Sequence, residues 1–118
     1  MNAELALNAD QIRTGMMFRT NMEPNGGMLF VLPQPQRASF WMMNCFVPLS
    51  AAYIDPDGTI LEIHSLQPQN TNPVVAAALN IQYVLETPQG WFERNQVATG
   101  AVIRTERGSL PETFFRRR

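Results

Sequence analysis

Apolar residues along this chain gather in short runs, and turn-forming residues separate each run from the next. The runs that stand out are Ala3–Asn8, Met28–Leu32, Ala38–Asn44, Ala52–Ile54, Ile60–Ile63, Ile81–Glu86 and Ala101–Thr105. Short, bounded apolar runs are typical of buried β-strands. The pattern therefore predicts about six or seven short strands joined by turns.

The clearest local signal is the turn Asp55-Pro56-Asp57-Gly58, which lies between two of these apolar runs. Proline presets the backbone for a turn, and glycine tolerates the positive φ at its exit. The strand ending near Ile54 and the strand beginning at Ile60 are therefore predicted to form a β-hairpin.

Three segments are predicted to contain helical turns instead of strands. Residues 9–14 follow a candidate N-cap, Asn8, and precede a candidate stop, Gly15. The alanines after Val75 and the segment from Pro88 to Gly100 are the other two, whereas Pro33–Gln36 is predicted to be a loop.

Together these elements predict one all-β dominated domain, a small sandwich-like or partly open β-barrel with two or three short helical turns. The predicted domain spans residues 3–105. Residues 106–118 have no apolar periodicity and are predicted to be a C-terminal tail.

Composition narrows the possible partners. The chain has 118 residues, a net charge of −1 and nine basic residues, all of them arginine. Only Arg116–Arg118 cluster in sequence, so the charge pattern does not predict nucleic-acid binding. No apolar run has the length of a membrane span. No signal peptide is visible, and an export signal could have preceded Met1 in a longer precursor.

Metal and cofactor chemistry has little support in the sequence. Cys45 is the only cysteine and His64 the only histidine, which excludes an internal disulfide and leaves a zinc site without enough ligands. Asp55 and Asp57 are explained by the turn that they flank. We expect no cofactor and no metal, and we expect Cys45 to be a buried, unreactive thiol.

A hydrolytic triad could in principle combine Ser39 or Ser50 with His64 and Asp55. The sequence has no nucleophile-elbow motif to support such a trio. A hydrolase is therefore the least favoured of the functions considered.

The stretch from Phe40 to Leu49 is the most unusual in the chain. It is predicted to be a strand that ends near Asn44, followed by an exit loop, because Pro48 cannot donate to a central ladder. In a strand, Phe40 and Met42 would share one face, and Trp41 and Met43 the other. One face would be core; the other is either core as well or a surface for a ligand or partner.

The candidate ligand-binding residues are Arg19, Trp41, Asn44, Glu86 and Trp91. In this hypothesis Trp41 and Trp91 supply flat apolar faces, and Arg19 and Asn44 form a polar rim. The alternative is structural: Arg19 pairs with Glu86 or binds loop carbonyls and holds the fold together.

Five segments, taken in order, resemble one family. They are GMMFR (15–19), GMLFVLP (27–33), FWMMNCFVPLS (40–50), DPDGTI (55–60) and YVLETPQGWF (83–92). Their order and spacing resemble the bacterial and archaeal domain-of-unknown-function family 192. The resemblance implies a small, mainly β domain with no established reaction. It also implies an extracytoplasmic location, in the periplasm or envelope, because many members carry export signals.

The chain departs from the family pattern at several positions. Met43 stands where the pattern has lysine, Cys45 where it has threonine, and Ser50 where it often has aspartate. Ala101 replaces an aspartate that follows Gly100. These departures weaken any catalytic or metal-binding hypothesis that depends on the replaced residues.

Two functions remain open from the sequence. The first is an extracytoplasmic module that binds a small molecule or carbohydrate in an aromatic cleft with Arg and Asn at its rim. The second is an envelope interaction or assembly protein whose apolar surface is a protein–protein patch. The expected partners are accordingly a small molecule or an envelope protein, with no membrane span; the oligomeric state is left open.

Overall fold

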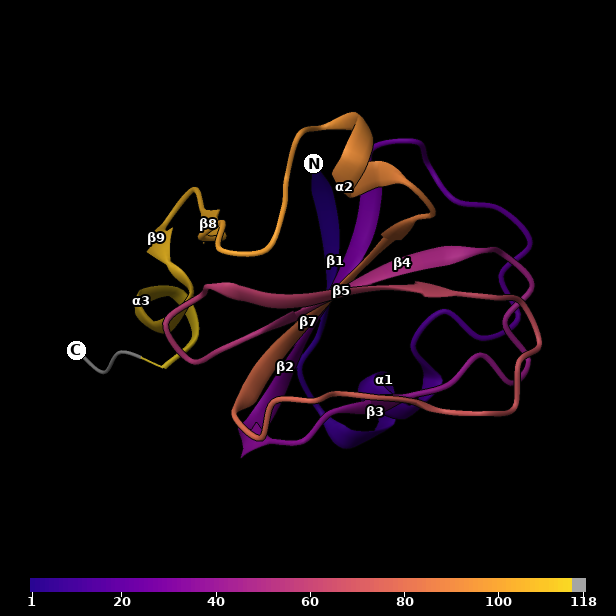
Figure 1. Ribbon diagram of the computed structural model, residues 1–118, viewed down its shortest axis with the longest axis horizontal. Helices are drawn as coiled ribbons and strands as arrows, with labels where there is room; N and C mark the ends of the chain where they lie inside the picture. The colour runs from indigo at the N-terminus through magenta and orange to yellow at the C-terminus, as the bar shows by residue number, and fades with distance from the viewer. Residues whose placement is uncertain (116–118) are drawn as a thin grey trace.

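The computed structural model describes residues 1–115, and the main element of these residues is one open sheet of five strands (Figure 1). The strands are β1 (Asn2–Ala6), β2 (Gly26–Gln36), β4 (Leu49–Ile54), β5 (Ile60–Leu66) and β7 (Ile81–Pro88). Their order is β1-β2-β7-β4-β5, with β1 parallel to β2 and the other neighbours antiparallel. The sheet does not close, so β1 and β5 are its edges.

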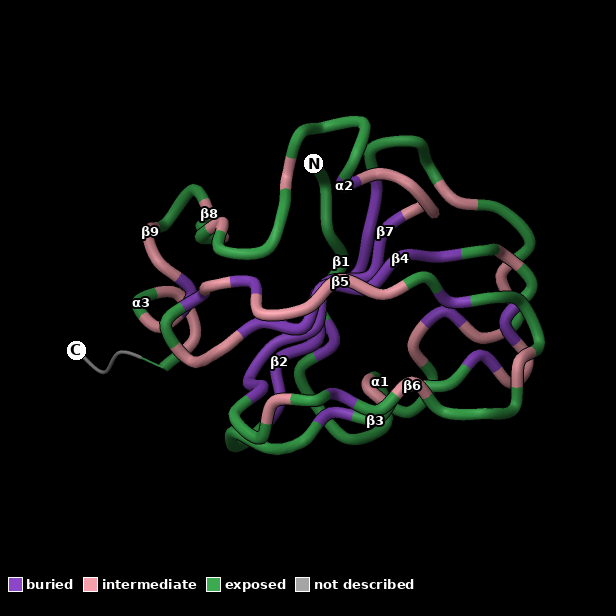
Figure 2. Tube along the Cα trace, viewed as in Figure 1, coloured by how far each residue is buried: buried purple, intermediate pink, exposed green. Residues whose placement is uncertain are grey.

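The sheet is buried on both faces, because successive residues of its central strands enter two separate cores. On β2, Met28, Phe30 and Leu32 join one core, whereas Leu29 and Val31 join the other. This alternation follows from the two-residue period of a strand. Figure 2 shows the buried residues following the strands through the middle of the molecule. The predicted all-β dominated fold is confirmed, and its main sheet is open and not closed into a barrel.

The first face is covered by helix α1 (Ala9–Thr14) and by a ribbon of two short strands, β3 (Ser39–Phe40) and β6 (Val74–Val75). Helix α1 begins where predicted. Asn8 Oδ1 accepts a hydrogen bond from the backbone N–H of Gln11 at 2.9 Å, and Gln11 Oε1 accepts one from the backbone N–H of Asn8. This is a capping box. The helix ends at Gly15, whose φ is +46°.

The second face is covered by helix α2 (Trp91–Arg94) and by residues near the C-terminus. These residues form β8 (Arg104–Thr105), β9 (Gly108–Ser109) and α3 (Leu110–Phe114). The stretch from residue 106 was predicted to be a tail, yet the side chain of Leu110 is fully buried in the second core. The basic cluster Arg116–Arg118 lies outside the described residues.

The predicted hairpin at Asp55–Gly58 is confirmed, with β4 and β5 antiparallel on either side of it. Asp55 Oδ1 accepts hydrogen bonds from the backbone N–H groups of Asp57 and Thr59, both at 2.9 Å. The aspartate therefore stabilises the turn itself, as the sequence indicated.

Other local predictions were wrong. Pro33–Gln36 is the end of β2 and not a loop, and it lies within the register shift between Val31 and Gln36. Because β1 stops at the partner of Phe30, the prolines occupy a part of β2 that no longer needs to donate to β1. The alanines after Val75 form no helix, and the predicted strand at 38–44 shrinks to β3. Helix α2 also ends well before Gly100.

Of the three described helices, α3 and α2 are shorter than α1, and none combines the length and apolar character needed to cross a membrane.

Candidate ligand pocket

A pocket of about 250 Å³ lies on the first face of the sheet, and we call it the Glu86 pocket. Four parts of the chain line it: residues 12–17 of α1 and the turn after it, part of β2, the segment 38–45 around β3, and Glu86 of β7. Segments far apart in sequence therefore meet here, because β2 and β7 are neighbours in the sheet and α1 and β3 cover them.

Glu86 is the polar centre of this pocket. The residue is only 4% exposed, and it projects from the same face of β7 as the core residue Val84. No described residue donates a hydrogen bond to its carboxyl group or forms an ion pair with it. Burial without a partner disfavours the charged form, so desolvation raises the pKa of Glu86 to about 8. The group is therefore mostly a neutral carboxylic acid at pH 7.

Aromatic rings form one wall of the pocket. Phe30 and Phe40 meet edge to face with their ring centroids 4.9 Å apart, and both line the pocket. Trp41 also lines it and remains 50% exposed, so it contributes to both the pocket and the outer surface. The predicted separation into two faces does not hold, because β3 ends at Phe40 and Phe40, Trp41 and Met43 all line the same pocket, while Met42 is buried in the core.

Sulfur-containing side chains form much of the remaining wall. Met16, Met17, Met43 and Cys45 all contribute to the lining. Met43 and Cys45 are two of the positions at which the chain departs from the family pattern. Both departures thus fall beside Glu86, and the site has no lysine ammonium next to its carboxyl group.

Cys45 is expected to be unreactive in the folded protein. It is 5% exposed, and burial together with the charge of Glu86 raises the pKa of its thiol to about 11. Since the thiolate is the reactive form, iodoacetamide at pH 7.5 should label native Cys45 at least roughly a hundredfold more slowly than the same protein in urea. Equal labelling rates in the two states would contradict the burial of this thiol.

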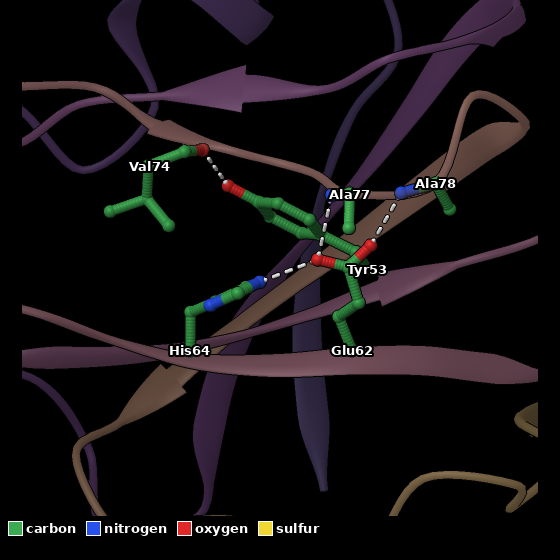
Figure 3. A network of polar contacts seen from close by, with 6 residues as sticks. All are labelled: Tyr53, Glu62, His64, Val74, Ala77 and Ala78. Atoms are coloured by element: carbon green, nitrogen blue, oxygen red, sulfur yellow. Dashed lines mark hydrogen bonds and ion pairs between the residues drawn. The ribbon is translucent and has the colours of Figure 1, made fainter.

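A polar clasp fixes the ribbon that forms the aromatic wall, and Figure 3 shows its contacts. Glu62 of β5 accepts hydrogen bonds from the backbone N–H groups of Ala77 at 3.1 Å and Ala78 at 2.8 Å. His64 Nε2 lies 2.8 Å from the same carboxylate. Burial acts to raise the pKa of Glu62, but the hydrogen bonds from Ala78, His64 and Ala77 outweigh it and lower the pKa.

Tyr53 completes the clasp from the neighbouring strand β4. Its hydroxyl donates to the carbonyl oxygen of Val74 on β6 (Figure 3), and its ring lies 6.2 Å from that of Phe40, measured between centroids. Because β6 pairs with β3, these contacts hold Phe40 against the sheet at the edge of the Glu86 pocket.

Arg19 lies in a second hollow, of about 930 Å³, formed by Asn2, Glu4 and residues 18–27. Its guanidinium makes a bidentate pair with Glu4 of β1, with Nη2 2.9 Å from Oε1. The predicted pairing with Glu86 is therefore wrong, because β1 brings Glu4 closer to the turn that carries Arg19. The pair raises the pKa of Arg19 and lowers that of Glu4.

Arg19→Met is expected to cost little stability. The side chains of Arg19 and Glu4 are 38% and 55% exposed, so water competes with the pair. We expect a loss of roughly 0.2–1 kcal/mol in urea unfolding, with a double-mutant cycle against Glu4→Gln giving a coupling of the same size. A coupling well above this range would mean that the pair is an essential part of the fold.

Asn44 and Trp91 are not in either pocket lining. Asn44 has a positive φ of +61°, and its backbone oxygen accepts from Phe18 N–H at 2.8 Å. Asn44 therefore joins the segment after β3 to the turn that carries Arg19. Trp91 packs into the second core, and its Nε1 donates to Asn25 Oδ1 at 3.0 Å. Of the five candidate residues, the structure brings Trp41 and Glu86 into one pocket and leaves the other three outside it.

The hypothetical hydrolytic trio is not assembled. His64 contacts Glu62, Asp55 binds its own turn, and Ser50 Oγ accepts from the backbone N–H of Gly90 at 3.0 Å. Among residues 1–115, no group of three or more His, Cys, Asp or Glu residues is placed to hold a metal ion.

The sequence interpretation missed the contribution of Met16 and Met17. The available signal was their position directly after the helix stop at Gly15, where the chain must turn back onto the core. A helix followed at once by two methionines indicates a turn packed on apolar surface, although it does not show which strand lies beneath.

The fold and the pocket define a class of protein: a small β-sheet domain with a covered, largely apolar cavity and one buried acid. The family model for DUF192, described as an uncharacterised ACR, matches residues 1–105, so the chain belongs to this family. A search of curated proteins finds no match.

Two solved structures are similar. One, from Sinorhizobium meliloti 1021 and described as a "putative transcription regulator", is 34% identical with a TM-score of 0.79; the match covers 83% of this chain and 76% of that one. The other, from Novosphingobium aromaticivorans DSM 12444, is a protein of unknown function. It is 31% identical with a TM-score of 0.79, and the match covers 83% of this chain and 70% of that one.

Proposed function

We propose that the protein is a binding module for a small, mostly apolar ligand, and that the Glu86 pocket is its binding site. The observation that carries the proposal is the buried Glu86 carboxyl group, which has no partner among residues 1–115 and lines a cavity of about 250 Å³. Among the described residues the Tyr83 hydroxyl is the fully enclosed polar group without a partner, whereas the Glu86 oxygens keep some accessible surface, which agrees with their place in the lining of the cavity. A buried acid that relies on a cavity for its partner calls for a functional reason. A ligand polar group would satisfy it.

The composition of the walls supports the same function. Ligand pockets are mostly apolar with a small number of placed polar groups. Here the aromatic and sulfur side chains provide the apolar surface, Glu86 provides the polar anchor, and the half-exposed Trp41 provides an edge that a ligand meets on entry.

The two tryptophans allow a matched test. Trp41 lines the Glu86 pocket, whereas Trp91 packs on the other face of the sheet. The fragment screen is read by tryptophan fluorescence in two variants, each of which keeps one tryptophan. We expect fragments that change the emission of Trp41 in the Trp91→Phe variant and do not change the emission of Trp91 in the Trp41→Phe variant. A screen in which no fragment alters Trp41 emission, or in which only Trp91 responds, would contradict the proposal.

A second candidate, an interaction protein, is favoured by apolar side chains exposed near the pocket. Phe18, Trp41 and Phe46 are each more than two-fifths exposed. The backbone N–H of Phe18 donates to the carbonyl oxygen of Asn44, which lies between Trp41 and Phe46 in the sequence. The occupant would be a second copy of this chain. Sedimentation equilibrium should then give a dimer that Phe18→Ser weakens, and a monomer at every concentration tested would remove this candidate.

We also propose an extracytoplasmic location for the native protein, which is what the family resemblance in the sequence implied. A reporter that is active only outside the cytoplasm, fused to the C-terminus of the full-length gene product, tests this location. An inactive reporter on a stably expressed fusion would contradict it.

A further inference from the structure

We infer that the ligand of the Glu86 pocket is a small organic cation, an alkylammonium ion whose charged group sits against the Glu86 carboxylate and whose alkyl part contacts the aromatic and sulfur walls. This inference rests on the proposed function, since it names the chemistry of the ligand that the pocket would take. It is carried by the unpaired acid, by the aromatic wall around it and by the distribution of charge at the pocket.

The first argument is the balance of charge. Glu86 is the one acidic residue in the pocket lining, and the one basic residue there is Arg13 of α1. Arg13 is largely exposed, with a 74% exposed side chain, and its guanidinium lies 3.4 Å from Asp10. Among residues 1–115, therefore, no cationic side chain is placed against Glu86. A buried carboxylate is costly unless it is paired, and a ligand ammonium would supply the missing partner.

The second argument is the chemistry of the walls. Phe30, Phe40 and Trp41 present aromatic rings, which attract cations through their faces and accept alkyl groups by burial. The thioethers of Met16, Met17 and Met43 are polarizable and adapt to irregular apolar shapes. An ammonium ion with an alkyl tail matches an acid surrounded by such groups, whereas a carboxylate ligand would meet Glu86 with a like charge whenever Glu86 is ionised.

A third argument concerns which groups titrate together. Among residues 1–115, the titratable groups facing Glu86 are Cys45 on the segment after β3, Tyr53 on β4 and, at the rim, Arg13 on α1. Burial raises the pKa of both the Cys45 thiol and the Tyr53 hydroxyl, so these two stay neutral near pH 7. Ammonium binding would therefore release a proton from Glu86 and from no other group of the pocket.

The test uses three probes of similar size and different charge: n-butylammonium, 1-butanol and butyrate. Binding to the full chain, labelled with ¹³C at the methionine methyl groups, is followed by NMR. The methyl groups of Met16, Met17 and Met43 report on the Glu86 pocket, and that of Met22 reports on the Arg19 hollow. Single Met→Leu substitutions assign the signals.

We expect n-butylammonium to shift the three pocket methyl groups and to bind at least about tenfold more tightly than 1-butanol, as one charge-assisted hydrogen bond allows. Its affinity should rise by more than about tenfold from pH 6.5 to 8.5, because the cation competes with the proton on Glu86. The Glu86→Gln variant should no longer bind n-butylammonium more tightly than 1-butanol, and its affinity for 1-butanol should be unchanged.

The remaining outcomes separate the two claims. If 1-butanol or butyrate binds the pocket at least as tightly as n-butylammonium, the binding function stands and the cation inference is overturned. The inference also fails if Glu86→Gln binds n-butylammonium as well as the unchanged protein does. If none of the three probes shifts the methyl groups of Met16, Met17 and Met43, both the cation inference and the proposed function fail.

Met43→Lys provides a second variant: a lysine in this wall should displace n-butylammonium, whereas Met43→Leu should not.

Discussion

Glu86→Gln is expected to raise the free energy of unfolding by roughly 2–4 kcal/mol near pH 9 and to change it little near pH 5. The variant replaces a buried group that can ionise with one of nearly the same shape that cannot. The expected effect is large because Glu86 is almost fully buried and has no partner among the described residues to offset its charge.

The direction follows from where the proton is held. Burial raises the pKa of Glu86 in the folded protein to about 8, from an ordinary value near 4.5. Below about pH 4.5 both states are protonated, and the group contributes nothing to the pH dependence. As the pH rises from there to about 8, the unfolded chain loses the proton first, so stability falls. Above about 8 the folded state is ionised too, and the penalty stays constant.

Urea unfolding of the unchanged protein and of Glu86→Gln at several pH values measures this difference. Glu106→Gln is a suitable control, because Glu106 is exposed and carries the same change of charge. Plotted against pH, the free energies of unfolding of the unchanged protein and of Glu86→Gln should diverge between pH 5 and 9. The free energies of the unchanged protein and of Glu106→Gln should stay parallel. Parallel behaviour of all three would contradict the unpaired state of the acid.

Glu62→Gln should destabilise the protein by roughly 1–3 kcal/mol at pH 7 and release the aromatic ribbon from the sheet. The glutamate accepts two backbone N–H groups and the His64 ring, whereas a glutamine would turn an NH₂ group toward one of these donors. The loss should appear as faster amide hydrogen exchange at Ala77 and Ala78. Unchanged exchange at these two amides would show that the clasp does not hold the ribbon.

The pH dependence of this contact has the opposite sign to that of Glu86. Hydrogen bonds lower the pKa of Glu62 in the folded protein. Its contribution to stability is therefore complete above about pH 4.5 and is lost as the pH falls through the folded value. In Glu62→Gln this acid-dependent loss should be missing, and Glu106→Gln again serves as the control.

The sequence predicted helix α1 and the Asp55 turn, because each of these elements depends only on residues close to it in the chain. Asn8 and Gly15 bound α1 because a cap and a positive φ depend on neighbouring residues only. The Asp55 turn is of the same kind. The short strand β3 and the irregular alanine segment 76–78 could not be predicted in this way, because distant residues such as Glu62 hold them in place.

The candidate site was predicted only in part, for the same reason. Trp41 and Glu86 could be named from residue type, but their meeting depends on β7 pairing with β2 and on the ribbon covering that face. Glu86 was considered as one partner of Arg19, and Glu4 was not, because the parallel pairing of β1 with β2 that brings Glu4 near has no signature in the sequence. Trp91 was placed with Trp41 although the two tryptophans lie on opposite faces of the sheet.

The state of the Glu86 carboxyl group in the free protein tests the account most directly. With ¹³C-labelled glutamate, the side-chain carboxyl signal that disappears in Glu86→Gln can be followed from pH 4 to 10. The account predicts a single titration with a midpoint near 8. A midpoint near the ordinary value of about 4.5 would mean that the group is paired or solvated, and the proposed site would lose its anchor.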